Sequence, residues 1–346
     1  MTEKFLAGMV ALSLGLLPAS PVFAAKKRAS RTRYKTPITH PVILWARTLS
    51  ASDDIEQKKV AAFKLSQYSQ PIYQEEAITS LTNCMKGDNA HLKVLCAKAM
   101  GKAGNQSRAE SIRKVLLEVY KNDPTLRDTL VRTFTVRKDG SKSVQDALLE
   151  TLQASTNSQE ALALLNYFQQ SGEGLRGDTF IEVFKRFSDD KVRRAAVKVL
   201  AEHASGEPQV VDLLAVCAES MNTPLALNCL AGLQLQARKD STRTWAALEK
   251  TLESSDPDVL LATLDVINVL PENPNPKIAK RLIEIIAETD DTDILDKSVL
   301  ALGVAGDHTQ PIVDTLFSLM SKSDTEEGTK IHVALVMGRQ ADLFPD

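Results

Sequence analysis

Residues 189–200 read DDKVRRAAVKVL, and the spacing of their apolar side chains decides the fold class. Val192, Ala196, Val197 and Leu200 are separated by four, one and three residues, which places them on one stripe of an α-helix. Basic Arg193 directly follows the first apolar residue. The stretch therefore predicts an amphipathic helix with one buried face.

The same frame recurs along the chain. With Val192 as frame position 0, matching stretches begin at residues 57, 92, 126, 160, 192, 225, 259, 294 and 329, and the copies at 57, 160 and 329 are weaker. Successive starts lie 32 to 35 residues apart, with a mean of 34. A fixed period of this length is typical of repeat proteins.

A second set of amphipathic segments lies between these stretches, so each period predicts two helices. Asp123-Pro124, Asp256-Pro257 and Thr223-Pro224 predict helix starts, because a capping side chain precedes a proline at the first helical position. Gly101, Gly206, Gly303 and Gly306 predict helix ends. One helix pair cannot bury its own apolar face, so stacked neighbours must supply the core. We expect an all-α αα-superhelix, a right-handed α-solenoid of about nine stacked helix-pair repeats.

Two stretches resemble the second helix of a HEAT repeat. They are the D-x-x-V-R-x-x-A-x-x-x-L pattern from Asp189 to Leu200 and LKVLCAKAMGKAG from Leu92 to Gly104. The short period resembles the compact bacterial type of HEAT-like protein. It also equals the tetratricopeptide length, but the signature of that family does not recur here. The resemblance implies a HEAT-like (armadillo-like helical) solenoid over residues 37–346 and a scaffold function.

The chain begins with MTEKFLAGMVALSLGLLPASPVFA, which has the features of a secretory signal peptide over residues 1–24. Its uncharged run from Phe5 to Leu17 is too short to span a membrane, and small residues precede a cleavage site after Ala24. An uncleaved amphipathic anchor is the alternative. We expect a bacterial periplasmic or secreted protein whose mature chain is not transmembrane.

The next residues, 25–36, contain six basic side chains and no acidic one. A disordered, solvated tail and electrostatic docking on an anionic envelope surface are both compatible with this pattern. The asymmetry extends further: residues 25–140 carry 22 basic and 11 acidic side chains, whereas residues 141–346 carry 19 and 32. Such a charge dipole could steer a partner or favour contact between the two ends of different copies.

Four cysteines occupy equivalent positions in two repeats. Cys84 and Cys217 lie eight residues before a frame start, and Cys96 and Cys229 lie four residues after it. In an antiparallel helix pair these positions face each other, within the Cα separation that a disulfide needs. In an oxidising compartment we expect the disulfides Cys84–Cys96 and Cys217–Cys229, and the alternative is four buried thiols.

Frame position +1 is basic in several repeats. We therefore consider these residues as candidate partner-binding positions on the concave face of the second helices, if they are free: Lys58, Lys93, Arg127 and Arg193, with Lys330 as a further example. The alternative is a structural ladder in which each pairs with an acidic residue between repeats.

The sequence contains no motif for catalysis, for a cofactor or for a metal. The five histidines form no H-E-x-x-H pair, and there is no G-x-S-x-G or phosphate-binding glycine loop. The net charge of −2, from 42 basic and 44 acidic residues in 346, does not favour nucleic acid as a partner. We expect an exported, non-enzymatic scaffold that binds an unidentified protein through its concave face, without a cofactor. The alternative is an envelope-binding module that uses the basic N-terminal half on anionic lipid or cell-wall polymer.

Overall fold

The computed structural model describes residues 40–68, 73–103, 109–172, 174–204, 206–306, 309–323 and 325–341, with side chains up to residue 338. The predicted signal peptide with its cleavage site at Ala24, the basic segment 25–36 and the first residues of the predicted solenoid lie outside these ranges.

The described ranges contain 18 α-helices and no β-strand, as the repeat period predicted. They form nine hairpins, each an odd-numbered helix followed by an even-numbered one. The odd-numbered helices are α1 (Pro41–Ala51), α3 (Gln74–Met85), α5 (Ala109–Asn122), α7 (Lys142–Ala154), α9 (Gly177–Arg186), α11 (Pro208–Ala218), α13 (Ser241–Thr251), α15 (Pro276–Glu288) and α17 (Gln310–Ser321). The even-numbered helices are α2 (Ile55–Ser66), α4 (Ala90–Lys102), α6 (Arg127–Arg137), α8 (Ser158–Ser171), α10 (Asp190–His203), α12 (Thr223–Gln236), α14 (Pro257–Val269), α16 (Thr292–Ala305) and α18 (Glu327–Ala341).

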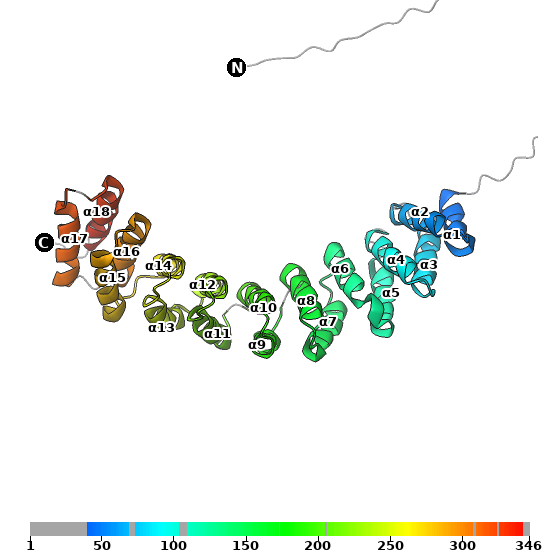
Figure 1. Cartoon of the computed structure of the whole chain (residues 1–346), viewed down its shortest axis with the longest axis horizontal. Helices are drawn as coiled ribbons and strands as arrows, with labels where there is room; N and C mark the ends of the chain where they lie inside the picture. The colour runs from blue at the N-terminus through cyan, green and yellow to red at the C-terminus, as the bar shows by residue number, and fades with distance from the viewer. Residues whose placement is uncertain are drawn as a thin grey trace, which may run out of the picture. The chain divides into compact units, whose positions relative to one another are not determined.

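The hairpins stack in two layers, with the even helices on one side and the odd helices on the other (Figure 1). Each even helix packs along the next even helix, from α2 to α18, and the odd helices contact one another less extensively. Helices that are far apart in sequence do not meet within the described ranges. This nearest-neighbour arrangement is the α-solenoid that the sequence predicted.

The predicted stripe forms a continuous core. Frame position +4 is fully buried in all nine even helices, at Ala61, Cys96, Leu130, Leu164, Ala196, Cys229, Thr263, Ser298 and Val333. Position +8 is equally buried in the first eight, where it carries Leu65, Met100, Phe134, Phe168, Leu200, Leu233, Ile267 and Leu302. Each hairpin therefore contributes one layer to an interior that no single hairpin could close.

An aspartate or asparagine caps the N-terminal end of seven second helices and, before α6, of the 3-10 helix η2 (Pro124–Leu126) that leads into it. It lies three residues before each frame start, at Asp54, Asn89, Asp123, Asn157, Asp189, Asn222, Asp256 and Asp291. Each side chain accepts a hydrogen bond from a backbone N–H of the first turn. The prediction that Thr223 caps α12 was wrong, because Asn222 takes that position and the Thr223 hydroxyl instead donates to Asp256.

Two of the glycines predicted to end helices lie inside them. Gly101 belongs to the last turn of α4, and Gly303 to that of α16. Each allows the next even helix to approach, since a Cβ on Gly101 would lie 2.7 Å from Cγ2 of Thr133. Gly306 directly follows α16, and Gly206 adopts a positive φ of 92° after α10, so these two do follow helix ends.

Within the part of the chain that the structure describes, no helix combines the length and the apolar character needed to cross a membrane.

Candidate functional site

The structure brings both predicted cysteine pairs together. The Cα atoms lie 6.1 Å apart for Cys84 and Cys96 and 5.8 Å apart for Cys217 and Cys229, and each pair is joined as a disulfide between the two helices of one hairpin. Cys96 and Cys229 occupy the fully buried +4 position, and Cys217 is 5% exposed. Both disulfides therefore lie against the core. One joins the two helices of the second hairpin, and the other joins the two helices of the sixth.

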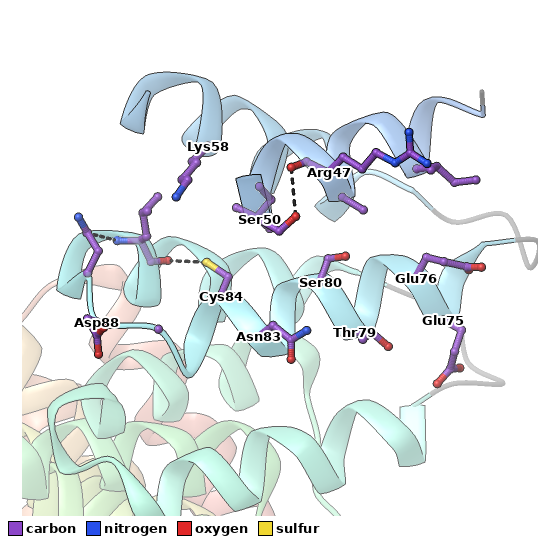
Figure 2. Close-up of a pocket in the computed structure, with 16 residues that line it drawn as sticks. Arg47, Ser50, Lys58, Glu75, Glu76, Thr79, Ser80, Asn83, Cys84 and Asp88 are labelled. Carbon is purple, nitrogen blue, oxygen red and sulfur yellow. Dashed lines mark hydrogen bonds between the residues drawn. The ribbon is translucent and has the colours of Figure 1, made fainter. Parts of the chain in front are cut away.

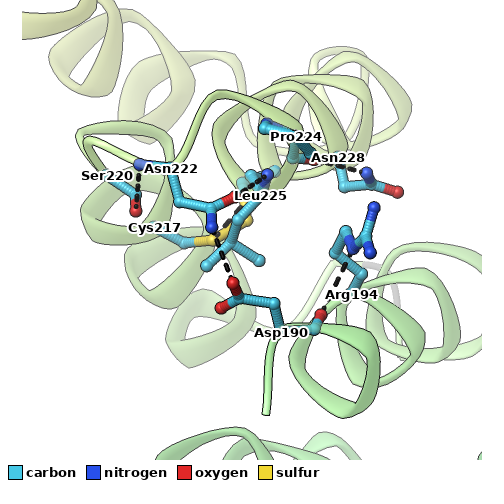
Figure 3. Close-up of a disulfide and its surroundings, with 9 residues drawn as sticks. Asp190, Arg194, Cys217, Ser220, Asn222, Pro224, Leu225 and Asn228 are labelled. Atoms are coloured by element: carbon cyan, nitrogen blue, oxygen red, sulfur yellow. Dashed lines mark hydrogen bonds between the residues drawn. A yellow bond between two sulfur atoms is a disulfide. The ribbon is translucent and has the colours of Figure 1, made fainter. Parts of the chain in front are cut away.

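The turn beside Cys217–Cys229 is held by polar contacts to its own helix and to the preceding hairpin (Figure 3). Asn222 accepts from the N–H of Leu225 at 3.0 Å and donates from Nδ2 to Oδ2 of Asp190 at 2.7 Å. Its own N–H donates to the hydroxyl of Ser220. Because these contacts fix the turn, the facing cysteine positions are held in register.

A groove of about 670 Å³ lies between α1 and α3 and is bounded by the turn that leads into α4 (Figure 2). Arg47 and Ser50 lie on its α1 wall, and Ser80 and Asn83 lie on its α3 wall. Lys58 of α2 closes one end, near the Cys84–Cys96 disulfide. Glu75, Glu76 and Asp88 also line it, so the walls mix cationic, acidic, hydroxyl and amide groups, which suits a polar segment held by hydrogen bonds.

The structure places two of the basic +1 residues in grooves beside the odd helices. Lys58 lines the groove between α1 and α3, and Arg127 lines the corresponding groove between α5 and α7. These two residues therefore lie beside the odd helices, and partner binding at the +1 positions stays a prediction. Both residues lie near the start of their second helix, beside the turn that joins the two helices of the hairpin.

Three of the four candidate binding residues make local contacts. Lys93 forms an ion pair with Asp123 of the next hairpin at 2.9 Å, as in the ladder alternative. Arg127 and Arg193 instead each lie over an aromatic ring of their own hairpin, Tyr120 and Phe184. The guanidinium group of Arg127 also donates to the backbone carbonyl oxygen of Tyr120. The guanidinium group of Arg193 donates to the backbone carbonyl oxygen of Phe187 at 2.8 Å. Lys58 has no ion-pair partner among the described residues.

The exposed face of the even helices carries grooves that the sequence analysis did not identify. A groove of about 730 Å³ lies between α6 and α8, with Arg132, Val136 and Asn166 among its lining residues. A smaller one of about 110 Å³ lies between α2 and α4, where Phe63 is 56% exposed beside Lys98. The side chains at frame positions +2, +6 and +10 lie on this face. Both apolar and polar residues occur at these positions, and this mixture is the sequence signal that could have located the face.

A polar network joins the second, third and fourth hairpins behind these grooves. Arg137 donates from Nη1 to the carbonyl oxygens of Met100, Gly101 and Ala103 at 3.1 to 3.3 Å and so caps the C-terminal end of α4. Arg113 donates to both carboxylate oxygens of Asp139, and this hydrogen bond raises the pKa of Arg113. The hydroxyl of Tyr167 donates to the backbone carbonyl of Asp139 at 2.6 Å. These contacts fix the relative positions of neighbouring repeats.

The described residues contain no group of three His, Cys, Asp or Glu side chains arranged to hold a metal ion. The acidic turn before α16 serves as a helix cap, because Asp291 accepts from the N–H groups of Asp293 and Ile294. His332 lies 3.3 Å from Asp296 between α16 and α18. This pair, like the Lys93–Asp123 pair, joins adjacent repeats.

Comparison with solved structures identifies other helical arrays. An engineered protein from a structural genomics consortium aligns with a TM-score of 0.51 at 16% identity, over 87% of this chain and 89% of that one. Kap95p aligns with a TM-score of 0.54 at 14% identity. Its structure is described as showing that Kap95p binding induces the switch loops of RanGDP to adopt the GTP-bound conformation. That match covers 87% of this chain and 46% of Kap95p. No protein-family model matches the chain, and no curated protein is similar to it.

The chain has the fold of an α-solenoid. At these identities the likenesses show the fold alone, and they say nothing of the grooves described above.

Proposed function

We propose that this protein is an exported, non-enzymatic scaffold that binds a protein partner along the exposed face of its even helices. The observation that carries the proposal is the succession of grooves on that face, between α2 and α4 and between α6 and α8. Half-exposed apolar side chains such as Phe63, Val136 and Leu235 lie there beside charged and amide groups. Protein interfaces combine apolar anchors with a polar surround in this way.

The even layer is favoured over the odd layer for a geometric reason. Its helices pack more extensively against one another than the odd helices do. The more closely packed layer of a solenoid lies on the inside of its curvature, and such concave surfaces are the ones that repeat proteins use for binding. Kap95p, which has a similar fold, is described as binding RanGDP, and a protein partner for this chain is proposed by analogy.

Export is supported by the two disulfides and by the sequence of the first 24 residues. Disulfides persist in oxidising compartments such as the periplasm and the extracellular space. We expect the mature protein to begin after Ala24, and N-terminal sequencing of the protein recovered from its native compartment would test this.

The sharpest test compares two helices of one hairpin. Leu235 on α12 is 56% exposed on the even face, and Val216 on α11 is 70% exposed on the odd face. Affinity capture from the envelope fraction should recover the same protein with wild type and with Val216→Glu, and should lose it with Leu235→Glu. Capture that is lost with Val216→Glu and kept with Leu235→Glu would place the binding face on the odd layer and contradict the proposal.

The charge distribution supports a second candidate, binding to an anionic envelope component. Lys59, Lys98 and Lys102 surround the groove between α2 and α4, and six further basic residues precede residue 36. Association with anionic vesicles or cell-wall polymer that falls steeply with salt, and is lost on deletion of residues 26–35, would favour this function. Salt-insensitive capture of one protein would favour the scaffold.

A further inference from the structure

Exposed apolar side chains are concentrated at the two ends of the described array. Of 13 large apolar side chains exposed in the described residues, eight belong to the first and last of the nine hairpins. They are Leu44, Ile55, Val60 and Phe63 at the first end and Phe317, Met320, Ile331 and Leu335 at the last. Terminal repeats of a soluble solenoid ordinarily present a polar outer face. These two ends instead have the character of interfaces.

The register of the array shows which positions an even helix presents to the next hairpin. In the groove between α2 and α4, positions +2, +5, +6 and +9 of α2 face positions +3, +6, +7 and +10 of α4. The corresponding residues of α18 are Ile331, Ala334, Leu335 and Gly338, and all four are exposed. Position +5 is buried in the eight preceding even helices, at Ala62, Ala97, Val131, Leu165, Val197, Leu230, Leu264 and Val299. At α18 the same face has no neighbouring helix among the described residues.

Gly338 independently supports this conclusion. It occupies position +9, as Gly101 and Gly303 do in α4 and α16. At those two positions an added Cβ would lie 2.7 Å from Cγ2 of Thr133 and 2.9 Å from Cγ2 of Val336, both at position +7 of the next even helix. At Gly338 no atom of the described residues lies within 4 Å of that point. The last helix therefore retains the opening that admits a neighbouring helix elsewhere in the array.

The first hairpin presents the complementary face. Val60, Phe63 and Lys64 occupy positions +3, +6 and +7 of α2, which face a preceding hairpin elsewhere in the array, and all three are exposed. Beside them a slot of about 340 Å³ is lined by residues of α1 and α2 alone, including Trp45 and Val60.

We propose that the last hairpin of one copy stacks on the first hairpin of a second copy, with α18 against α2, so that the array continues across the junction. The two end hairpins are themselves nearly neutral, so no charge repulsion opposes their contact. At longer range the pairing of unlike ends is favoured, because residues 25–140 have a net charge of +11 and residues 141–346 one of −13. Lys64 would lie near the C-terminal end of α18, where a cation is favoured. The contact is heterologous, and it produces a ring or an open series of copies. It does not depend on the proposed partner-binding function.

Complementation between two variants tests the junction. Leu335→Glu disrupts the last face and leaves the first face intact, whereas Val60→Glu does the reverse. Both side chains are about half exposed, at 55% and 48%, so we expect both variants to fold. In sedimentation velocity, wild type should form complexes that grow with concentration, and each variant alone should be monomeric. An equimolar mixture should form a one-to-one dimer and nothing larger, because a single compatible junction remains.

Val136→Glu, at an exposed position of an internal hairpin, is the matched control and should assemble as wild type does. Phe317→Glu and Leu44→Glu form a second pair of end-face variants, to be used if circular dichroism shows that a member of the first pair is unfolded. Wild type that remains monomeric at every concentration would overturn the proposal. So would dimers of Val60→Glu alone, since these would show that two last faces pair with each other, or a mixture that stays monomeric.

Discussion

Thr133 of α6 packs into the space left by the missing side chain of Gly101 on α4, where a Cβ would lie 2.7 Å from Cγ2 of Thr133. Val336 and Gly303 form the same contact near the other end of the array. The even helices therefore approach one another closely over their C-terminal turns. This close approach contributes to the tighter packing of the even layer.

Filling this space should destabilise the array. Gly101→Val places side-chain atoms where Thr133 already lies, so we expect the free energy of unfolding to fall by about 1–3 kcal/mol. Gly338→Ala is the matched control, because it meets no atom of the described residues and removes a helical glycine. It should leave the free energy of unfolding unchanged or raise it by up to about 1 kcal/mol. Urea denaturation measures both changes, and equal stability of wild type and Gly101→Val would contradict the packing argument.

The two disulfides should stabilise the folded chain. Each closes a loop with a sequence separation of 12 residues, so loss of one should lower the free energy of unfolding by about 3 kcal/mol on the loop-entropy model. The double substitutions Cys84→Ala/Cys96→Ala and Cys217→Ala/Cys229→Ala test each bond separately. Non-reducing peptide mapping of the native protein identifies the pairs directly. Free thiols at all four positions would contradict the assignment.

Much of the fold could be predicted from the sequence because repetition averages out weak local signals. The stripe at positions 0, +4, +5 and +8 is unambiguous only in a few copies, such as Val192 to Leu200. A common period identifies the remaining copies, and position +4 is buried even where it carries Thr263 or Ser298. The cysteine pairing followed from the same register, since an antiparallel hairpin places positions −8 and +4 opposite each other.

The interaction surfaces could not be predicted from the sequence in the same way. The sequence left open whether position +1 is free on the concave face or paired between repeats, and the structure places Lys58 and Arg127 in grooves beside the odd helices. Side-chain direction at this position depends on how the two helices of a hairpin cross. The end faces were not identified either, since Ala334 occupies position +5, which is buried in every preceding even helix. Only the structure shows that Ala334 has no neighbouring helix among the described residues.

Acid should weaken the contact between the second and third hairpins. Asp123 accepts a hydrogen bond from the hydroxyl of Thr125 and one from the ammonium of Lys93, at 2.9 Å, and both lower its pKa below the ordinary value of 3.8. A carboxylate with a lowered pKa stabilises the folded state above its unfolded pKa and loses that contribution as the pH falls through the folded value. The stability difference between wild type and Asp123→Asn should therefore be greatest near neutral pH and shrink below about pH 4.

Urea denaturation over a series of pH values measures this difference, because asparagine preserves the N-cap while removing the charge. Asp53→Asn is the control, since Asp53 is exposed and has no partner among the described residues. A difference between wild type and Asp123→Asn that is independent of pH would contradict the assigned role of the carboxylate.

The guanidinium of Arg137 should stabilise the junction between α4 and α6. It donates to three carbonyl oxygens at the C-terminal end of α4, and without it these buried acceptors would lose their shared donor. We expect Arg137→Met, which keeps much of the side-chain volume, to lower the free energy of unfolding by about 1–3 kcal/mol. Hydrogen exchange should also accelerate at the amides of the last turn of α4.

Arg132→Met on the same helix is the control. Arg132 is exposed, and its ion-pair partner among the described residues is Asp128, so the substitution should change stability by less than about 1 kcal/mol. If the two substitutions had equal effects, the contribution of Arg137 would come from its charge alone. It would then not come from its hydrogen bonds to the C-terminal end of α4 in the preceding repeat.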